Sequence, residues 1–243
     1  MLDEGFAAAA GAEMVAAMKG EYAGRRRART GLGMVGSIEA ADLRVARVPI
    51  HTLDLRDFHG FFGIDIKGIV GTRLLMHFRA TIDYPAAALI LRRDPPATRP
   101  ASGIPFSLVE THLILARGRL NDLPPSFFWV DTGLAGSGFL ASEAQLRAAG
   151  VDVDWSAARL GPGGGGLVRE VDVVIDSVTL GEGDAALRRD GIRGTVLEKA
   201  PSILGDRLGF EVGGLISHAF FRQHALTLDF ANMTLLLDPP SGA

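Results

Sequence analysis

The sequence feature that most constrains the fold is an internal repeat. Residues 68–84 align without a gap onto residues 214–230, so equivalent positions lie 146 residues apart (68 to 214). Most apolar positions keep their character, and three pairs stand out: Thr81 with Thr227, Asp83 with Asp229, and Tyr84 with Phe230. A chain that repeats at a fixed period builds one supersecondary unit more than once. The sequence therefore predicts two similar halves.

Two further matches follow in the same order along the chain. Residues 41–45 align with residues 171–175, and a glycine-rich stretch precedes each of them. The start of the chain up to Gly11 resembles the segment that ends at Gly150, at an offset of 139 (11 to 150). By this offset the counterpart of Asp131 would fall before Met1. We therefore expect the first repeat to lack its opening strands within this sequence.

The local patterns predict a mainly β fold. The 31 glycines and 12 prolines favour many turns between short strands. Residues 41–48, 108–116 and 127–130 have the character of strands, whereas the alanine-rich residues 2–19 favour a helix. Residues 93–104 are rich in Pro, Arg and Ser and predict a linker. We expect an N-terminal lobe over 1–92, this linker, and a C-terminal lobe over 105–243.

Composition excludes several classes of function. The net charge of −3 and a pI of about 6.1 argue against a nucleic-acid or anionic-membrane surface. Cysteine is absent, which excludes thiol nucleophiles, zinc–thiolate sites and disulfides. No apolar run approaches the roughly 18 residues of a membrane span. The start has no signal-peptide pattern, so the compartment stays open; a start upstream of Met1 would allow a periplasmic or secreted location.

One motif carries chemistry. The apolar run 127–130 leads into Asp131-Thr132-Gly133. Later in the same half come the glycine-rich residues 161–166 and the run Gly214-Leu215-Ile216-Ser217. An apolar strand, an Asp-Thr-Gly loop, a glycine-rich hairpin and a second apolar run in this order make a far more specific signal than the tripeptide alone.

At these residues the chain resembles the retropepsin-like and pepsin-like aspartic proteases, especially bacterial two-repeat members. The resemblance implies two pseudo-symmetric β-barrel lobes with short helices. It implies that Asp131 is half of a catalytic dyad, that Thr132 links the two catalytic loops, and that Gly133 allows the tight turn. Gly163, Gly164, Gly165 and Gly166 match the flap over the substrate. The family usually has a small residue where Leu134 stands and Gly where Ser217 stands.

The resemblance implies an aspartic endopeptidase that needs no cofactor or metal. Its substrate would be a peptide or unfolded protein, and a water activated between two aspartates would attack the peptide bond. Only one of these aspartates, Asp131, is identified here. The second would come from sequence upstream of Met1 or from a second chain in a homodimer. The alternative is a non-catalytic peptide-binding or assembly module on the same fold.

Other readings of the sequence are weaker. Residues 31–36 and 161–166 both fit G-x-G-x-x-G, but a dinucleotide site needs an apolar strand before the motif and a helix after it. None of the six histidines forms an H-x-x-x-H pair, and His218 and His224 are interpreted as surface or satisfied polar residues. Asp83 and Asp229 lie at predicted turns, where aspartate caps its own backbone.

Overall fold

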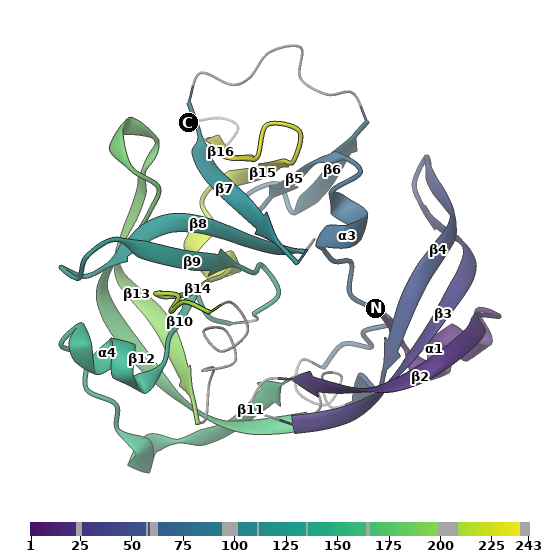
Figure 1. The fold of residues 1–243 in the computed structure, drawn as a ribbon, viewed down its shortest axis with the longest axis horizontal. Helices are drawn as coiled ribbons and strands as arrows, with labels where there is room; N and C mark the ends of the chain where they lie inside the picture. The colour runs from purple at the N-terminus through teal and green to yellow at the C-terminus, as the bar shows by residue number, and fades with distance from the viewer. Residues whose placement is uncertain are drawn as a thin grey trace. The chain divides into compact units, whose positions relative to one another are not determined.

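The protein is mainly β and divides into two compact units (Figure 1). The computed structural model describes residues 1–22, 26–56, 58, 63–93, 102–110, 112–134, 136–163, 166–198 and 209–238. The first unit comprises Met1–Val70 with Arg159–Arg169, and the second comprises Gly71–Ala158 with Glu170–Ala243. Each unit is described by itself.

The first unit contains a four-stranded sheet in the order β1-β4-β3-β2. Its elements are β1 (Leu2–Asp3), α1 (Glu4–Ala9), β2 (Glu13–Tyr22), β3 (Arg26–Ala40) and β4 (Leu43–Leu53). Strand β1 runs parallel to β4, and the other two pairings are antiparallel. The core of this unit is small, with Ala7, Val35 and Ile50 at its centre.

The expected helix over residues 2–19 is wrong beyond its first turns. Helix α1 begins after Asp3, whose carboxylate accepts a hydrogen bond from the Phe6 amide, and it ends at Ala9. Gly11 then takes φ +69°, a left-handed conformation that stops a helix. Residues 13–22 pair with β3 instead. Tertiary pairing has overridden the helix propensity of alanine, which is a weak preference.

The second unit contains a closed barrel of six strands. These are β8 (Leu113–Leu120), β9 (Ser126–Val130), β10 (Phe139–Leu140), β12 (Gly166–Leu180), β13 (Leu187–Leu197) and β14 (Gly214–Ile216). Their order is β12-β13-β10-β14-β9-β8, and β8 pairs again with β12. Closure leaves no free edge in this ring. The boundary between the two units falls within β12.

A five-stranded extension continues from β8 in the order β7-β16-β15-β5-β6. Its strands are β7 (Ile104–Val109), β16 (Thr234–Asp238), β15 (Ala225–Asp229), β5 (Arg79–Asp83) and β6 (Ala88–Arg92). The remaining elements of the second unit are α3 (Thr72–Leu75), α4 (Glu143–Ala148), η2 (Trp155–Ala157), η3 (Gly183–Ala185) and α6 (His218–Phe221). The strand β11 (Arg159–Gly163) precedes β12.

The observed units do not coincide with the expected lobes 1–92 and 105–243. Strand β5 pairs with β15, so residues 71–92 belong with the C-terminal residues. Most of the expected linker 93–104 lies outside the described residues, but Ile104 already begins β7 and is buried. The single strand expected over 108–116 is in fact β7 and β8, separated by a turn in which Glu110 has φ +48°.

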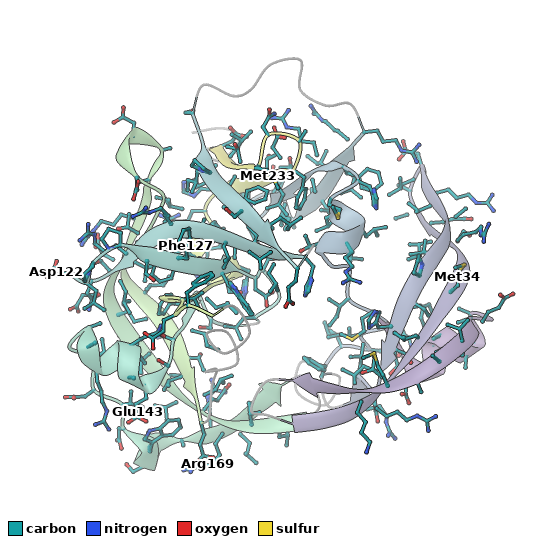
Figure 2. All side chains as sticks on the ribbon, viewed as in Figure 1. Met34, Asp122, Phe127, Glu143, Arg169 and Met233 are labelled. Atoms are coloured by element: carbon teal, nitrogen blue, oxygen red, sulfur yellow. The ribbon has the colours of Figure 1, made fainter. Side chains whose placement is uncertain are left out.

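The sequence repeat recurs in the structure at the same offset. Helices α3 and α6, strands β5 and β15, and strands β6 and β16 each begin and end 146 residues apart. The turns also match: Ala87 and Met233 (labelled in Figure 2) both have φ +50°. Asp83 accepts the Ala86 amide and Asp229 accepts the Asn232 amide, both at 3.0 Å. The predicted turn role of these two aspartates is therefore confirmed.

A local twofold axis passes between Thr81 and Thr227. The two residues are direct partners in the antiparallel pairing of β5 with β15, and their hydroxyl oxygens are 2.7 Å apart. Each residue is the repeat equivalent of the other, so exchanging the two strands leaves this register unchanged. Thr227 is buried. This pair therefore joins the two copies of the repeated hairpin.

Replacing Thr81 with Val should lower the free energy of unfolding by about 1 to 2 kcal/mol, because the buried Thr227 hydroxyl loses its partner. The double variant Thr81→Val/Thr227→Val should lose less than the sum of the single losses. Urea unfolding can be followed by the fluorescence of Trp129 and Trp155, both in the second unit. Thr179→Val in β12 is the matched control for a change from Thr to Val. If the losses of the two single variants add up to the loss of the double variant, the prediction is contradicted.

Replacing Tyr84 with Phe should leave stability unchanged or raise it slightly. Within the described residues the Tyr84 hydroxyl is buried without a hydrogen-bond partner, and its repeat equivalent is Phe230. Burial raises the pKa of Tyr84 to about 12. The contribution of Tyr84 ionisation to the free energy of unfolding is therefore fully present below pH 10, and it is lost as the pH rises through about 12. Ultraviolet titration of the two tyrosines should lose its later step in Tyr84→Phe.

Candidate functional site

The Asp-Thr-Gly motif lies directly after β9, a barrel strand with a paired neighbour on each side. Strand β9 pairs antiparallel with β8 on one side and parallel with β14 on the other. Val130 lies opposite Ile216, and the Asp131 amide donates to the Ile216 carbonyl at 3.0 Å. The side of β9 that carries Phe128 and Val130 faces the main core. Asp131 is therefore the first residue beyond a strand fixed on both edges.

Asp131 folds back onto its own loop. Its Oδ1 accepts a hydrogen bond from the Gly133 amide at 2.9 Å, which makes a tight turn of the kind aspartate favours. Within the described residues Oδ2 has no hydrogen-bond partner, and the side chain is exposed. A Cβ at Gly133 would lie 3.1 Å from Oδ1. The turn thus favours a small residue at 133 and leaves Oδ2 without a partner among the described residues.

Thr132 is half-buried beside this turn. Its hydroxyl makes no hydrogen bond to any residue that the structure describes. The three consecutive motif residues form one turn. The role expected of Thr132, a bond to a second loop, stays a prediction.

Two residues that sequence reasoning did not assign to the site hold the far end of the loop. The buried Ser217 hydroxyl accepts from the Leu134 amide at 3.2 Å and donates to the Leu134 carbonyl at 3.1 Å. His218 Nδ1 donates to the same carbonyl at 2.8 Å, so this nitrogen carries a proton. The Ser217 hydroxyl thus fixes the loop.

A sequence signal for Ser217 did exist. It is the last residue of the run 214–217 and the N-cap of α6, a position at which serine is common. Here its hydroxyl turns to another segment, and no side-chain cap bond forms in α6. The contact crosses 83 residues of sequence, so no local pattern could have revealed it. The interpretation of His218 as a satisfied polar residue agrees with its bond to Leu134.

Two of the four predicted flap residues lie at the ends of β11 and β12, which are neighbours in the sheet. Gly163 ends β11 and Gly166 begins β12, whereas Gly164 and Gly165 lie outside the described residues. Residues 159–169 belong to the first unit and Asp131 to the second. The other glycine-rich stretch, residues 31–36, lies inside β3. A strand through this stretch is not the strand–loop–helix that a dinucleotide site requires.

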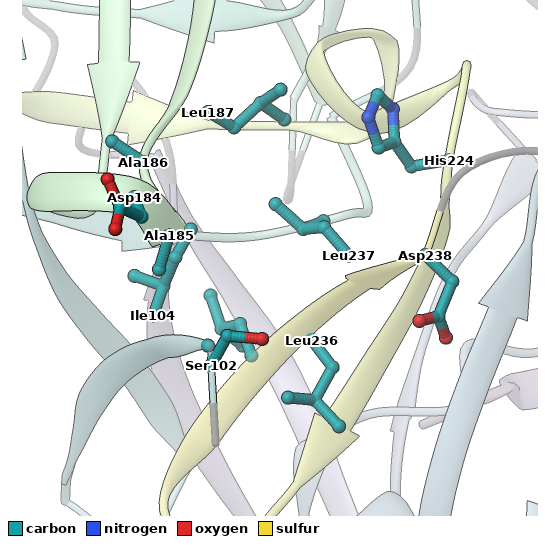
Figure 3. Close-up of a pocket in the computed structure, with 12 residues that line it drawn as sticks. Ser102, Ile104, Asp184, Ala185, Ala186, Leu187, His224, Leu236, Leu237 and Asp238 are labelled. Carbon is teal, nitrogen blue, oxygen red and sulfur yellow. The ribbon is translucent and has the colours of Figure 1, made fainter. Parts of the chain in front are cut away.

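A separate cavity of about 350 Å³ lies in the second unit (Figure 3). Leucines line it together with the polar groups of Asp184, His224 and Asp238. Arg189 Nη2 donates to His224 Nδ1 at 2.9 Å, and burial together with this cation lowers the pKa of His224. No residue of the loop 131–134 lines this cavity. The cavity is therefore separate from the turn at Asp131.

No protein-family model matches the chain, and no curated protein is significantly similar to it. Within the described residues no group of three His, Asp or Glu side chains could hold a metal ion. Among the helices of the described part, none has the length and apolar character to cross a membrane.

Replacing Ser217 with Ala should free the loop that follows Asp131. The Leu134 amide and carbonyl would both lose a buried partner, at a cost of about 1 to 2 kcal/mol in the free energy of unfolding. Hydrogen exchange of residues 131–134 should accelerate more than exchange in the barrel strands. Ser107→Ala, at an exposed position in β7, should change neither quantity. Unchanged exchange in the Ser217 variant would contradict the role given to this hydroxyl.

Proposed function

We propose that this chain contributes one half of an aspartic peptidase site, with Asp131 as its carboxylate. The observation that carries the proposal is the turn at the end of β9. There an exposed carboxylate is oriented by the Gly133 amide through one oxygen, and its other oxygen has no partner within the described residues. The loop is fixed at Asp131 by β14 and at Leu134 by Ser217. Such fixed positioning is what acid–base chemistry requires.

The chemistry needs a second carboxylate beside the first. Two carboxylates about 3 Å apart cannot both ionise, so they share one proton and titrate as a unit. The ionised member removes a proton from a water, which attacks the scissile carbonyl, while the protonated member donates to the carbonyl oxygen. In the proposal Asp131 is one member. The Thr132 hydroxyl then bonds the loop that carries the other.

The second carboxylate has no counterpart motif within residues 1–243, where Asp-Thr-Gly occurs once. It would come from residues outside this stretch or from a second copy of the chain. The substrate would be an extended peptide or an unfolded protein, bound through its main chain. The role of the glycine-rich residues around Gly163 and Gly166 as a flap stays part of the proposal.

Asp131→Asn should abolish peptide-bond cleavage, with a loss of roughly 10²- to 10⁴-fold or more, because general acid–base catalysis contributes about that much. The assay is cleavage of an unfolded protein at mildly acidic pH, followed by mass spectrometry of the products. Asp122→Asn, at an exposed position in the turn before β9, is the matched control (Figure 2). Cleavage that survives in Asp131→Asn would overturn the proposal.

The dependence of activity on protein concentration distinguishes the two sources proposed for the second carboxylate. If two copies form the site, the specific activity rises with concentration and a mixture of wild type with Asp131→Asn loses activity. If a further segment supplies it, residues 1–243 alone stay inactive at every concentration. Saturable peptide binding without cleavage, even with a second Asp-Thr-Gly loop present, would favour the non-catalytic module.

A further inference from the structure

The strand β14 has an equivalent in the first unit, at residues 68–70. In the second unit Leu140 pairs antiparallel with Leu215. In the first unit Met1 and Ile69, their repeat equivalents, exchange two backbone hydrogen bonds of 2.9 and 2.8 Å. Leu2 bridges Gly68 in the same register. The two copies of this pairing therefore agree residue for residue.

The close approach of the backbones is also repeated. A Cβ at Gly68 would lie 2.7 Å from the Met1 carbonyl oxygen, and a Cβ at Gly214 would lie 2.7 Å from the Leu140 carbonyl oxygen. Both positions therefore need glycine for the same steric reason. The run 68–70 is thus a second copy of β14, built to pack against the strand beside it.

The two copies differ at their other edge. Strand β14 pairs there with β9, and the Ile216 carbonyl accepts the Asp131 amide. Because Ile69 directs both of its backbone groups toward Met1, the groups of Gly68 and Val70 point to the opposite edge. Among the residues that the structure describes, neither Gly68 nor Val70 has a backbone hydrogen-bond partner at that edge. The edge that β9 occupies in one unit is therefore unpaired in the other, among the residues that the structure describes.

The side chains at this edge show the same difference. Ile69 and Val70 are 41% and 53% exposed, whereas their equivalents Leu215 and Ile216 are 9% and 0% exposed. An unpaired strand edge with exposed apolar side chains is a template for another strand. The internal repeat also specifies the chemistry of that strand, because β9 occupies the equivalent place.

We propose that residues 68–70 are an acceptor edge for a parallel strand of β9-like sequence, with large apolar residues leading into an aspartate loop. In the register of β9 on β14, the residue before the aspartate pairs with Val70, and the aspartate amide donates to the Val70 carbonyl. The docked strand then carries a second Asp-Thr-Gly loop on the first unit. That catalytic consequence rests on the proposed function, whereas the docking rests on the repeat geometry.

The partner is a separate strand rather than β9 of another copy. Strand β9 is hydrogen-bonded along both edges, to β8 and to β14, inside a closed barrel. A second copy would have to open its barrel to donate this strand. An extended segment that is not already part of a sheet has no such cost, since strand addition needs only free backbone groups.

The test uses a synthetic peptide with the sequence of residues 126–134, flanked by lysines for solubility and labelled with fluorescein. Fluorescence anisotropy should show saturable binding to the full chain, and a scrambled peptide should bind at least tenfold more weakly. Val70→Pro and Val70→Lys should each weaken binding at least tenfold, because one removes an edge amide and the other puts a charge there. Val15→Lys, at an exposed apolar position in β2, should leave binding unchanged.

The register can be tested by cross-linking, because the chain has no cysteine. Cys introduced at Val70 should form a disulfide with a peptide Cys at the position of Val130, and not with one at the position of Phe127. Equal binding of the scrambled peptide, or binding unaffected by both Val70 variants, would overturn the inference. Folding of each variant is checked by circular dichroism, and the two chemically different changes guard against one that unfolds.

Peptide binding and peptide-bond cleavage test the acceptor edge and the proposed function separately. A bound peptide that yields no cleavage of an unfolded protein would overturn the peptidase proposal and leave the acceptor edge intact. Cleavage that requires both the peptide aspartate and Asp131 would support both. A peptide with Asn in place of its aspartate should bind with the same affinity and give no cleavage.

Discussion

The parallel pairing of β9 with the three-residue strand β14 is the contact on which the site depends. It buries Leu215 and Ile216, closes the barrel between β9 and β10, and ends where the Asp131 amide meets the Ile216 carbonyl. On its other side β14 packs so closely against β10 that position 214 requires glycine. Strand geometry alone thus brings a carboxylate to the rim of a rigid barrel, where loop residues commonly carry function.

The same strand type appears twice, and the difference between the copies organises our functional hypothesis. In the second unit the edge is filled and its aspartate loop is fixed by Ser217. In the first unit the equivalent edge at Gly68–Val70 is open among the described residues. Aspartic-peptidase chemistry needs two such loops. The proposed peptidase site and the proposed acceptor edge therefore both derive from the same internal repeat.

Much of the local structure could be predicted because its causes are local. The turn aspartates Asp83 and Asp229, for example, cap their own backbones. The failures have a different origin. Residues 13–19 look helical in isolation but pair with β3, and the Ser217–Leu134 contact joins residues 83 positions apart. Neither the strand pairing nor this contact can be predicted from helix propensity or from the spacing of residues.

The sequence by itself determined the repeat, its offset of 146, the mainly β class and the position of the Asp-Thr-Gly turn. These follow from side-chain periodicity, glycine and turn chemistry, which act over a few residues. Only the tertiary structure decided that residues 71–92 join the C-terminal unit, through the pairing of Thr81 with Thr227. It also decided that β14 pairs with β9, whereas residues 68–70 have no strand at the equivalent edge within the described part of the chain. Pairing between distant strands depends on where the chain returns in space, and no local pattern encodes that.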